Sequence, residues 1–216
     1  MQNIAVILAG GHGSRFESNI PKQFAKIHGK EIIKLTVEKF AVKEINQIIV
    51  AVIEEYIPQA ANLLQEYPNL HIIKGGKTRT ESSFNALKFI DEMQWQNSFV
   101  LIHDCARPFI SSKDIQTLIS AKQNFQAVTL ATHSRNTLYH TENNTVQKII
   151  DRSTVFEAQT PQCFHFKLIF SCYNKLQESQ DLTDDVSVVL EHSHTPIHII
   201  HPTTKNNKIT YKHDIE

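Results

Sequence analysis

Short apolar runs alternate with amphipathic stretches through the first 130 residues of this 216-residue chain. The helical patterns lie at about residues 31–41, 58–66, 82–93 and 112–123. The apolar runs are short enough for buried strands and lie at residues 4–9, 48–52, 70–73, 99–102 and 127–131. Alternation of this kind is typical of α/β proteins, so we expect a single doubly wound, mostly parallel sheet with helices on both faces. The length favours one domain over residues 1–216.

The pattern changes at about residues 135–150. Two β-prone stretches, 137–140 and 145–150, flank the turn-forming residues 142–144. We therefore expect an inserted β-hairpin arm. A hairpin cannot bury both of its faces alone, which favours packing on a second copy in a homodimer. The alternative is a surface excursion with no partner.

The composition excludes several classes of protein. With 22 basic and 22 acidic residues, nothing indicates a nucleic-acid-binding or membrane-binding surface. No apolar run approaches the roughly 20 residues of a membrane helix, and no basic region precedes the first run, as it would in a signal peptide. The odd number of cysteines, without CxxC spacing, is typical of reduced thiols, so we expect a cytoplasmic protein: Cys105, Cys163 and Cys172. The histidines near the C-terminus lack a cysteine cluster or an HExxH helix, so no metal site is predicted there.

A glycine-rich loop directly follows the first apolar run, at residues 8–15, and Pro21-Lys22-Gln23 follows it. Glycines at a strand end let backbone N–H groups approach phosphate oxygens closely. Arg15 and Lys22 add two cations where a polyphosphate would lie. The spacing excludes a Walker loop, and Phe16 stands where a dinucleotide fingerprint needs its third glycine. An ordinary strand-to-helix loop is the alternative.

Further polar clusters lie at the ends of later apolar runs. Residues 103–108, His-Asp-Cys-Ala-Arg-Pro, follow the fourth run, and their carboxylate could bind substrate hydroxyls or Mg²⁺. A structural ion pair between Asp104 and Arg107 is the alternative. Residues 183–185 are typical of a helix N-cap, and residues 206–210 place Lys208 in a β-prone run.

Taken in order, these motifs resemble the family of alcohol-phosphate cytidylyltransferases. The similar blocks cover nearly the whole chain, at residues 8–15, 21–23, 75–82, 103–108, 159–164, 183–184 and 207–210. Of these, Gln159–Phe164 and His103–Pro108 are the most specific, whereas the glycine loop is shared with other nucleotidyltransferases. The resemblance implies transfer of CMP from CTP to a small polyol phosphate, with Mg²⁺ held mainly by the nucleotide phosphates.

The resemblance also implies roles for individual residues. Four cations would act in catalysis, the first two on the α-phosphate and the last two on the acceptor phosphate: Arg15, Lys22, Arg152 and Lys208. The CTP site would comprise Leu8, Ala9, Gly10, Gly11, Gly13, Gly76, Lys77, Ser82 and Cys105. The acceptor would contact Asp104, Arg107 and Thr137.

Several positions depart from the family pattern. Lys77 stands where an acid is usual, Asn136 where an aspartate commonly precedes Thr137, and Cys105 where a small residue is usual. The departures leave the acceptor open between methylerythritol phosphate, which the motifs at 151–152 and 183–185 favour, and ribitol 5-phosphate. A sugar-1-phosphate nucleotidyltransferase would explain residues 8–22 but not 159–162. An inactive nucleotide-binding assembly protein is the remoter alternative.

Overall fold

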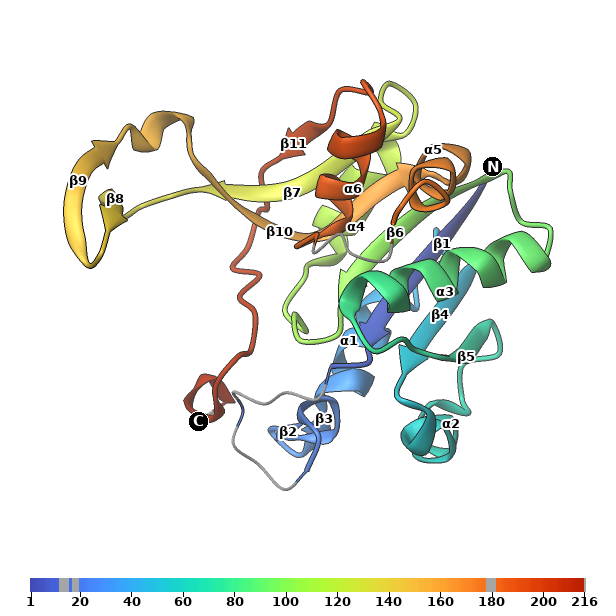
Figure 1. The fold of residues 1–216 in the computed structure, drawn as a ribbon. Coiled ribbons are helices and arrows are strands. Elements are labelled where there is room, and N and C mark those ends of the chain that lie inside the picture. The colour runs from blue at the N-terminus through green and yellow to red at the C-terminus, as the bar shows by residue number, and fades with distance from the viewer. Residues whose placement is uncertain (12–15, 17–19, 178–181, 216) are drawn as a thin grey trace.

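The fold is built on a seven-stranded sheet in the order β11-β7-β10-β6-β1-β4-β5 (Figure 1). We describe it from a computed structural model, which covers residues 1–11, 16, 20–177 and 182–215. The strands are β1 (Gln2–Ala9), β4 (Gln47–Val52), β5 (Leu70–Lys74), β6 (Ser98–Asp104), β7 (Ala127–His133), β10 (Phe156–His165) and β11 (His198–Ile200). The five strands expected from the sequence are confirmed, each within a few residues of its expected bounds.

All neighbouring strands run parallel except β10, which is antiparallel to both β6 and β7. The motif at residues 159–164 therefore belongs to a strand inserted between two parallel strands. The sequence analysis assigned no strand there, because Thr160, Pro161 and Gln162 interrupt any apolar alternation. The β10 register to β7 shifts between Ala158 and Gln162, where this polar segment lies.

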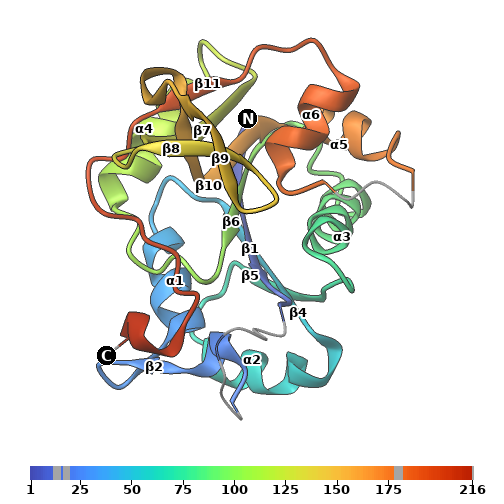
Figure 2. The ribbon, with the colours of Figure 1, turned by 60° about the vertical axis from the view of Figure 1, so that its left-hand side comes forward.

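Helices cover both faces of the sheet (Figure 2). Alternate residues of β1 face opposite cores: Ala5 and Ile7 pack with α1, α2 and α4, while Ile4 and Val6 pack with α3, α5 and α6. The expected helices are α1 (Ile32–Phe40), α2 (Ile57–Leu64), α3 (Arg79–Glu92) and α4 (Ser112–Ala121). The helix α6 (Asp185–His192) begins at the N-cap expected at residues 183–185, and α5 (Phe166–Tyr173) is additional. This arrangement confirms the doubly wound α/β fold.

The hairpin arm is formed by β8 (Leu138–Glu142) and β9 (Thr145–Ile150), which pair only with each other. Asn143 and Asn144 form its two-residue turn, both with positive φ, as a type I′ turn requires. Figure 1 shows the arm standing away from the sheet, beyond the ends of β7 and β10. The predicted hairpin is confirmed.

The smaller elements lie beside the sheet. A two-stranded ribbon, β2 (Lys26–Ile27) and β3 (Lys30–Glu31), leads into α1, and the 3₁₀ turns are Lys22–Phe24, Glu54–Tyr56, Arg152–Thr154 and Lys212–Ile215. Residues 206–210, a β-prone run in the sequence, form no strand. No helix in the described ranges is long and apolar enough to cross a membrane.

Candidate active site

The polar motifs meet at the carboxyl ends of β1, β5 and β6. A cavity of about 190 Å³ opens there, lined by Leu8, Ala9, Gly10, Gly11, Lys22, Gln23, Ile32, Lys77, Thr78, Arg79, Ser82, Asp104, Cys105, Ala106 and Lys208. Parallel sheets bind ligands at this edge because loops diverge from the strand ends. The structure thus gathers most of the CTP residues expected from the sequence around one cavity. Gly13 and Arg15 lie outside the described residues, and Gly76 is adjacent to the lining residue Lys77.

Glycines leave little spare room where the loops after β1 and β5 touch. A Cβ on Gly10 would lie 3.1 Å from the Ser82 hydroxyl, and one on Gly75 would lie 3.2 Å from both that hydroxyl and the Val52 carbonyl. The Ser82 hydroxyl donates to Thr78 O at 2.9 Å and accepts the Gly76 N–H at 2.9 Å. Ser82 therefore shapes the Gly75-Gly76 loop, and its expected role in holding the nucleotide remains a prediction.

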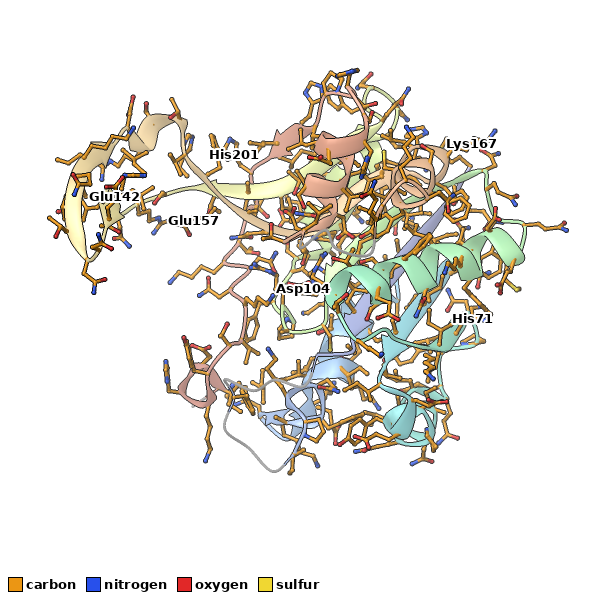
Figure 3. The ribbon with its side chains drawn as sticks, viewed as in Figure 1. His71, Asp104, Glu142, Glu157, Lys167 and His201 are labelled. Carbon is orange, nitrogen blue, oxygen red and sulfur yellow. The ribbon has the colours of Figure 1, made fainter. Side chains whose placement is uncertain are left out.

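Asp104 stands at the centre of the site, at the end of β6 (Figure 3). Its Oδ1 accepts from Arg79 Nε at 3.1 Å, its Oδ2 accepts from Lys208 Nζ at 2.7 Å, and Arg107 Nε lies 4.0 Å away. Burial alone would raise the pKa of Asp104, but the positive charges of Arg79, Lys208 and Arg107 hold it well below its usual value. The carboxylate is therefore ionised at neutral pH.

Arg107 does not act as the simple ion-pair partner of Asp104. Its Nη1 donates to Asn206 O at 2.8 Å, and its Nη2 donates to Ala158 O at 3.4 Å. Asn206 in turn donates from Nδ2 to Thr160 O at 2.7 Å. Arg107 and Asn206 thus connect the C-terminal segment and β10 to the loop after β6, which brings Lys208 to Asp104.

His103, directly before Asp104, is fully buried and orders this loop. The Arg107 carbonyl can only accept, so Nε2 of His103 carries a proton and donates to it at 3.0 Å. Nδ1 of the neutral ring then accepts from the Thr160 hydroxyl at 3.0 Å, and that hydroxyl also accepts the Asp104 N–H at 3.1 Å. Burial lowers the pKa of His103 to about 4, so the imidazole is neutral at pH 7.

A second cavity lies on the other side of Asp104. Its lining is more polar and includes Arg79, Asp104, Arg107, Ala158, Gln159, Thr160, Gln162, Thr183, Asp184 and Lys208. The two cavities share Arg79, Asp104 and Lys208. Two ligands could therefore meet across these three charged side chains.

Thr137 and Arg152 do not join this site in the single chain. Thr137 directly precedes the arm, and Arg152, at the arm's base, donates from Nη1 to Arg135 O at 2.9 Å. Arg152 lines a separate open cavity with His133, Ser134, Arg135, Asp151 and Ser153, which shares no residue with the other two. The arrangement implied by the resemblance, with Arg152 and Lys208 around one phosphate, is thus not formed within one chain.

The remaining expected residues of the site, Lys22, Lys77 and Cys105, are held by different contacts. Lys22 donates to Ile209 O at 3.0 Å, and Lys77 N–H donates to Glu81 Oε2 at 2.7 Å. Burial raises the pKa of Cys105 to about 12, so its thiol is neutral and not a nucleophile. The three cysteines are free and buried.

The sequence analysis missed Arg79, Asp185 and Tyr173. Arg79 occurs within the Gly-Gly-x-x-Arg block, but no role was assigned to it. A signal was present: Arg79 is the first residue of α3, where a cation is unfavourable beside the positive end of the helix dipole. Such a residue needs nearby carboxylates, and the structure supplies two.

The site also sets limits on a metal ion. Within the described ranges, no three His, Cys, Asp or Glu side chains are grouped to hold one. Asp104 is the one acidic residue that lines the first cavity in the described part of the chain. Mg²⁺ commonly binds through one or two carboxylates together with substrate phosphates, and this donor set fits that mode but not an all-protein cage.

Comparison with known proteins agrees with this site. Residues 3–216 match the family model described as 2-C-methyl-D-erythritol 4-phosphate cytidylyltransferase. A protein of that name from Thermosipho melanesiensis is 39% identical over 215 residues, covering 99% of this chain and 94% of the relative. Its counterpart from Thermosipho africanus is 37% identical, covering 98% of this chain and 94% of the relative.

Solved structures show the same relationship. The 4-diphosphocytidyl-2C-methyl-D-erythritol synthase of Anaerococcus prevotii superposes with a TM-score of 0.86 at 30% identity, covering 99% of this chain and 92% of that one. The 2-C-methyl-D-erythritol 4-phosphate cytidylyltransferase of Francisella tularensis superposes with a TM-score of 0.84 at 29% identity, covering 100% of this chain and 97% of that one. The chain belongs to the 2-C-methyl-D-erythritol 4-phosphate cytidylyltransferase family.

Proposed function

We propose that this enzyme transfers CMP from CTP to 2-C-methyl-D-erythritol 4-phosphate, forming the CDP-alcohol and pyrophosphate. The observation that carries the proposal is the pair of cavities that share Arg79, Asp104 and Lys208. The glycine-lined cavity suits the nucleotide, because open backbone at a strand end can approach phosphates and a base edge. The more polar cavity, with Arg107 and Thr160, suits a polyol phosphate.

The reaction needs no nucleophile from the protein. The acceptor phosphate is ionised at neutral pH and attacks the α-phosphorus of CTP itself, and pyrophosphate leaves. The role of the chain is then to position two polyanions and to stabilise the added charge of the transition state. Lys22 and Lys208 are two of the four described cations that line the nucleotide cavity, beside Lys77 and Arg79, and we assign this role to them; Arg15 remains a prediction.

Mg²⁺ would be the cofactor, bound mainly to the triphosphate with Asp104 as the nearest carboxylate. It would reduce repulsion between the phosphates and the incoming anion. Asp104, with both oxygens already held by cations, would orient a polyol hydroxyl or an ion-bound water through its remaining lone pairs.

A homodimer would complete the site. Arg152 and Thr137 lie away from Asp104 in one chain, on an arm whose exposed apolar residues lack a covering surface: Tyr139, Val146 and Ile149. Tyr139 pairs with Ile149, and Thr141 pairs with Val146, so these side chains share one face of the hairpin. We propose that this face packs on a second copy and that Arg152 serves the acceptor site of that copy. Residues 1–216 would form one domain of each subunit, in the cytoplasm.

Pyrophosphate release tests the proposed activity. Purified protein with Mg²⁺ is given CTP, UTP, ATP or GTP, each with methylerythritol phosphate, ribitol 5-phosphate or a sugar 1-phosphate. We expect turnover with CTP and methylerythritol phosphate to exceed every other pair. A preference for ribitol 5-phosphate would show that the acceptor is ribitol 5-phosphate instead. Equal use of purine nucleotides would refute cytidylyl transfer. No turnover with any pair would favour an inactive binding protein.

A further inference from the structure

Three polar side chains behind Asp104, a partly buried arginine and two buried residues, form a continuous chain of hydrogen bonds. Arg79 donates from Nε to Asp104 Oδ1 at 3.1 Å and from Nη2 to Asp185 Oδ2 at 2.7 Å. The Tyr173 hydroxyl donates to the other carboxylate oxygen, Asp185 Oδ1, at 2.6 Å. One guanidinium therefore bridges an acid at the cavity wall and an acid in the core.

The inner end of this chain is fixed from several sides. Asp185 has no solvent exposure, and Tyr173 is 1% exposed. The Tyr173 ring stacks on Phe84 of α3 with centroids 5.6 Å apart. Gln162 Oε1 accepts the backbone N–H groups of Asp185 and Val186 at 2.9 and 3.1 Å, which fixes the first turn of α6 against β10. Asp185 is therefore a rigid anchor for the guanidinium.

The choice of residues also indicates a function beyond folding. An arginine at the first position of α3 faces an unfavourable helix dipole, and an acid at the first position of α6 faces a favourable one. A single ion pair between Arg79 and Asp185 would be enough to join the two helix starts. The second bond of Arg79, to Asp104, adds nothing to that pairing and reaches instead to the wall that separates the two cavities.

Arg79 also retains one donor. Its Nη1 is buried and makes no hydrogen bond to any described residue, although Arg79 lines both cavities. An unpaired buried donor is unfavourable unless a ligand oxygen reaches it. Two of its nitrogens are thus held on carboxylates, and the third is left without a described partner.

We infer that Arg79 is a positioning residue for the acceptor, with Asp185 and Tyr173 holding its guanidinium so that it orients Asp104 at the wall between the two cavities. The inference rests on the proposed function and goes one step deeper into the same site. A lysine could not replace Arg79, because one ammonium cannot reach two carboxylates in the fixed geometry of the guanidinium fork.

Three variants weaken successive bonds of the chain. Arg79→Lys keeps the charge but loses the bridge, Asp185→Asn removes the inner anchor charge, and Tyr173→Phe removes one hydroxyl while keeping the stacked ring. Tyr67→Phe is the matched control, because Tyr67 packs on the opposite core and touches neither cavity. For each protein we would measure steady-state kinetics with both substrates and titrate CTP calorimetrically.

We expect the acceptor KM to rise about tenfold or more in Arg79→Lys and Asp185→Asn and about threefold in Tyr173→Phe. The reason is that Asp104 would no longer be held in the orientation that contacts the acceptor. The CTP dissociation constant should remain within about twofold of wild type, and Tyr67→Phe should match wild type in both. If Asp185→Asn does not fold, the other two variants still decide the question.

Two results separate the possible failures. A wild-type enzyme that forms no product from any acceptor would overturn the proposed function. An active wild-type enzyme whose variants keep the wild-type acceptor KM, or lose CTP affinity by the same factor, would overturn the positioning role of Arg79 alone.

Discussion

The Lys208 ammonium lies 2.7 Å from Asp104 Oδ2, although the two residues are 104 positions apart. The C-terminal segment is held in place for this contact by its own backbone: Ile209 N–H donates to Ala106 O at 2.8 Å, and Ile209 O accepts from Lys22 at 3.0 Å. Two lysines from opposite ends of the chain are thereby placed on one cavity wall. This relationship is the basis for the charge stabilisation that we propose.

Replacing Lys208 by glutamine should lower kcat/KM by about 10²-fold, because a preorganised positive charge beside the reacting phosphates is lost. The loss of folding stability should be small, since the lysine side chain is 39% exposed. Lys205→Gln, on the same segment, is the control and should retain wild-type kinetics. Steady-state assays with thermal unfolding of each variant provide the test, and equal kinetics for the two variants would contradict it.

A methyl group at Gly76 should impair the nucleotide loop. A Cβ there would collide with the Glu81 side chain, so the loop after β5 or Glu81 at the start of α3 must shift. We expect Gly76→Ala to raise the KM for CTP about tenfold or more, with little change in the acceptor KM. For folding stability, Gly11→Ala is the comparison, because nothing lies within 4 Å of a Cβ at Gly11. Thermal unfolding without ligand should show a clearly larger loss for Gly76→Ala.

The fold was largely predictable from the sequence, because its elements depend on local apolar periodicity. Strands such as 4–9 and 48–52 are buried on both faces, so they form continuous apolar runs. The strand β10 was not predicted because its centre carries the polar residues Thr160 and Gln162. Their side chains form hydrogen bonds to Asp104 and to the first turn of α6. The chain of hydrogen bonds through Arg79 was not predicted either. Its three residues, 79, 173 and 185, are far apart in the sequence, and only tertiary packing brings them together.

The separation of Arg152 from Asp104 has a different cause. A family resemblance assigns residues to a site without stating which subunit supplies them. Lys22, Lys208 and Asp104 lie together in one chain, whereas Thr137 and Arg152 lie away from them, and in the proposed dimer the arm would bring these two residues to another copy. Their expected roles therefore remain predictions of the proposed dimer.

Buried His103 should make folding stability depend on pH. Its pKa is about 4 in the folded state and about 6.5 when unfolded, so the unfolded chain binds more protons between these values. Stability should therefore fall with pH below about 6.5, by about 2 kcal/mol between pH 7 and pH 5 from this residue alone. Glutamine can accept from Thr160 and donate to Arg107 O, so His103→Gln should reduce this dependence. Urea unfolding at both pH values measures this dependence; an equal loss of stability in the wild type and in His103→Gln would show that folding does not lower the pKa of His103.

Mutant mixing tests whether Arg152 acts in the site of the other subunit. Arg152→Ala and Lys208→Ala should each be nearly inactive as homodimers, because every site in them lacks one cation. If Arg152 serves the neighbouring site, a mixed dimer places both defects in one site and leaves the other intact. Random mixing in equal amounts should then restore about a quarter of wild-type activity.

The control for this experiment removes the arm contact itself. Ile149→Glu places a charge on the apolar face formed with Tyr139. The change should shift the protein towards monomers, which light scattering measures. Introduced into both Arg152→Ala and Lys208→Ala, it should abolish the recovery of activity on mixing. His140→Glu, on a neighbouring position of the arm with an ordinary polar side chain, should leave the dimer and the recovery intact. If mixed proteins remain inactive although dimers exchange, Arg152 acts within its own chain, and the arm must then fold back to bring it to Asp104.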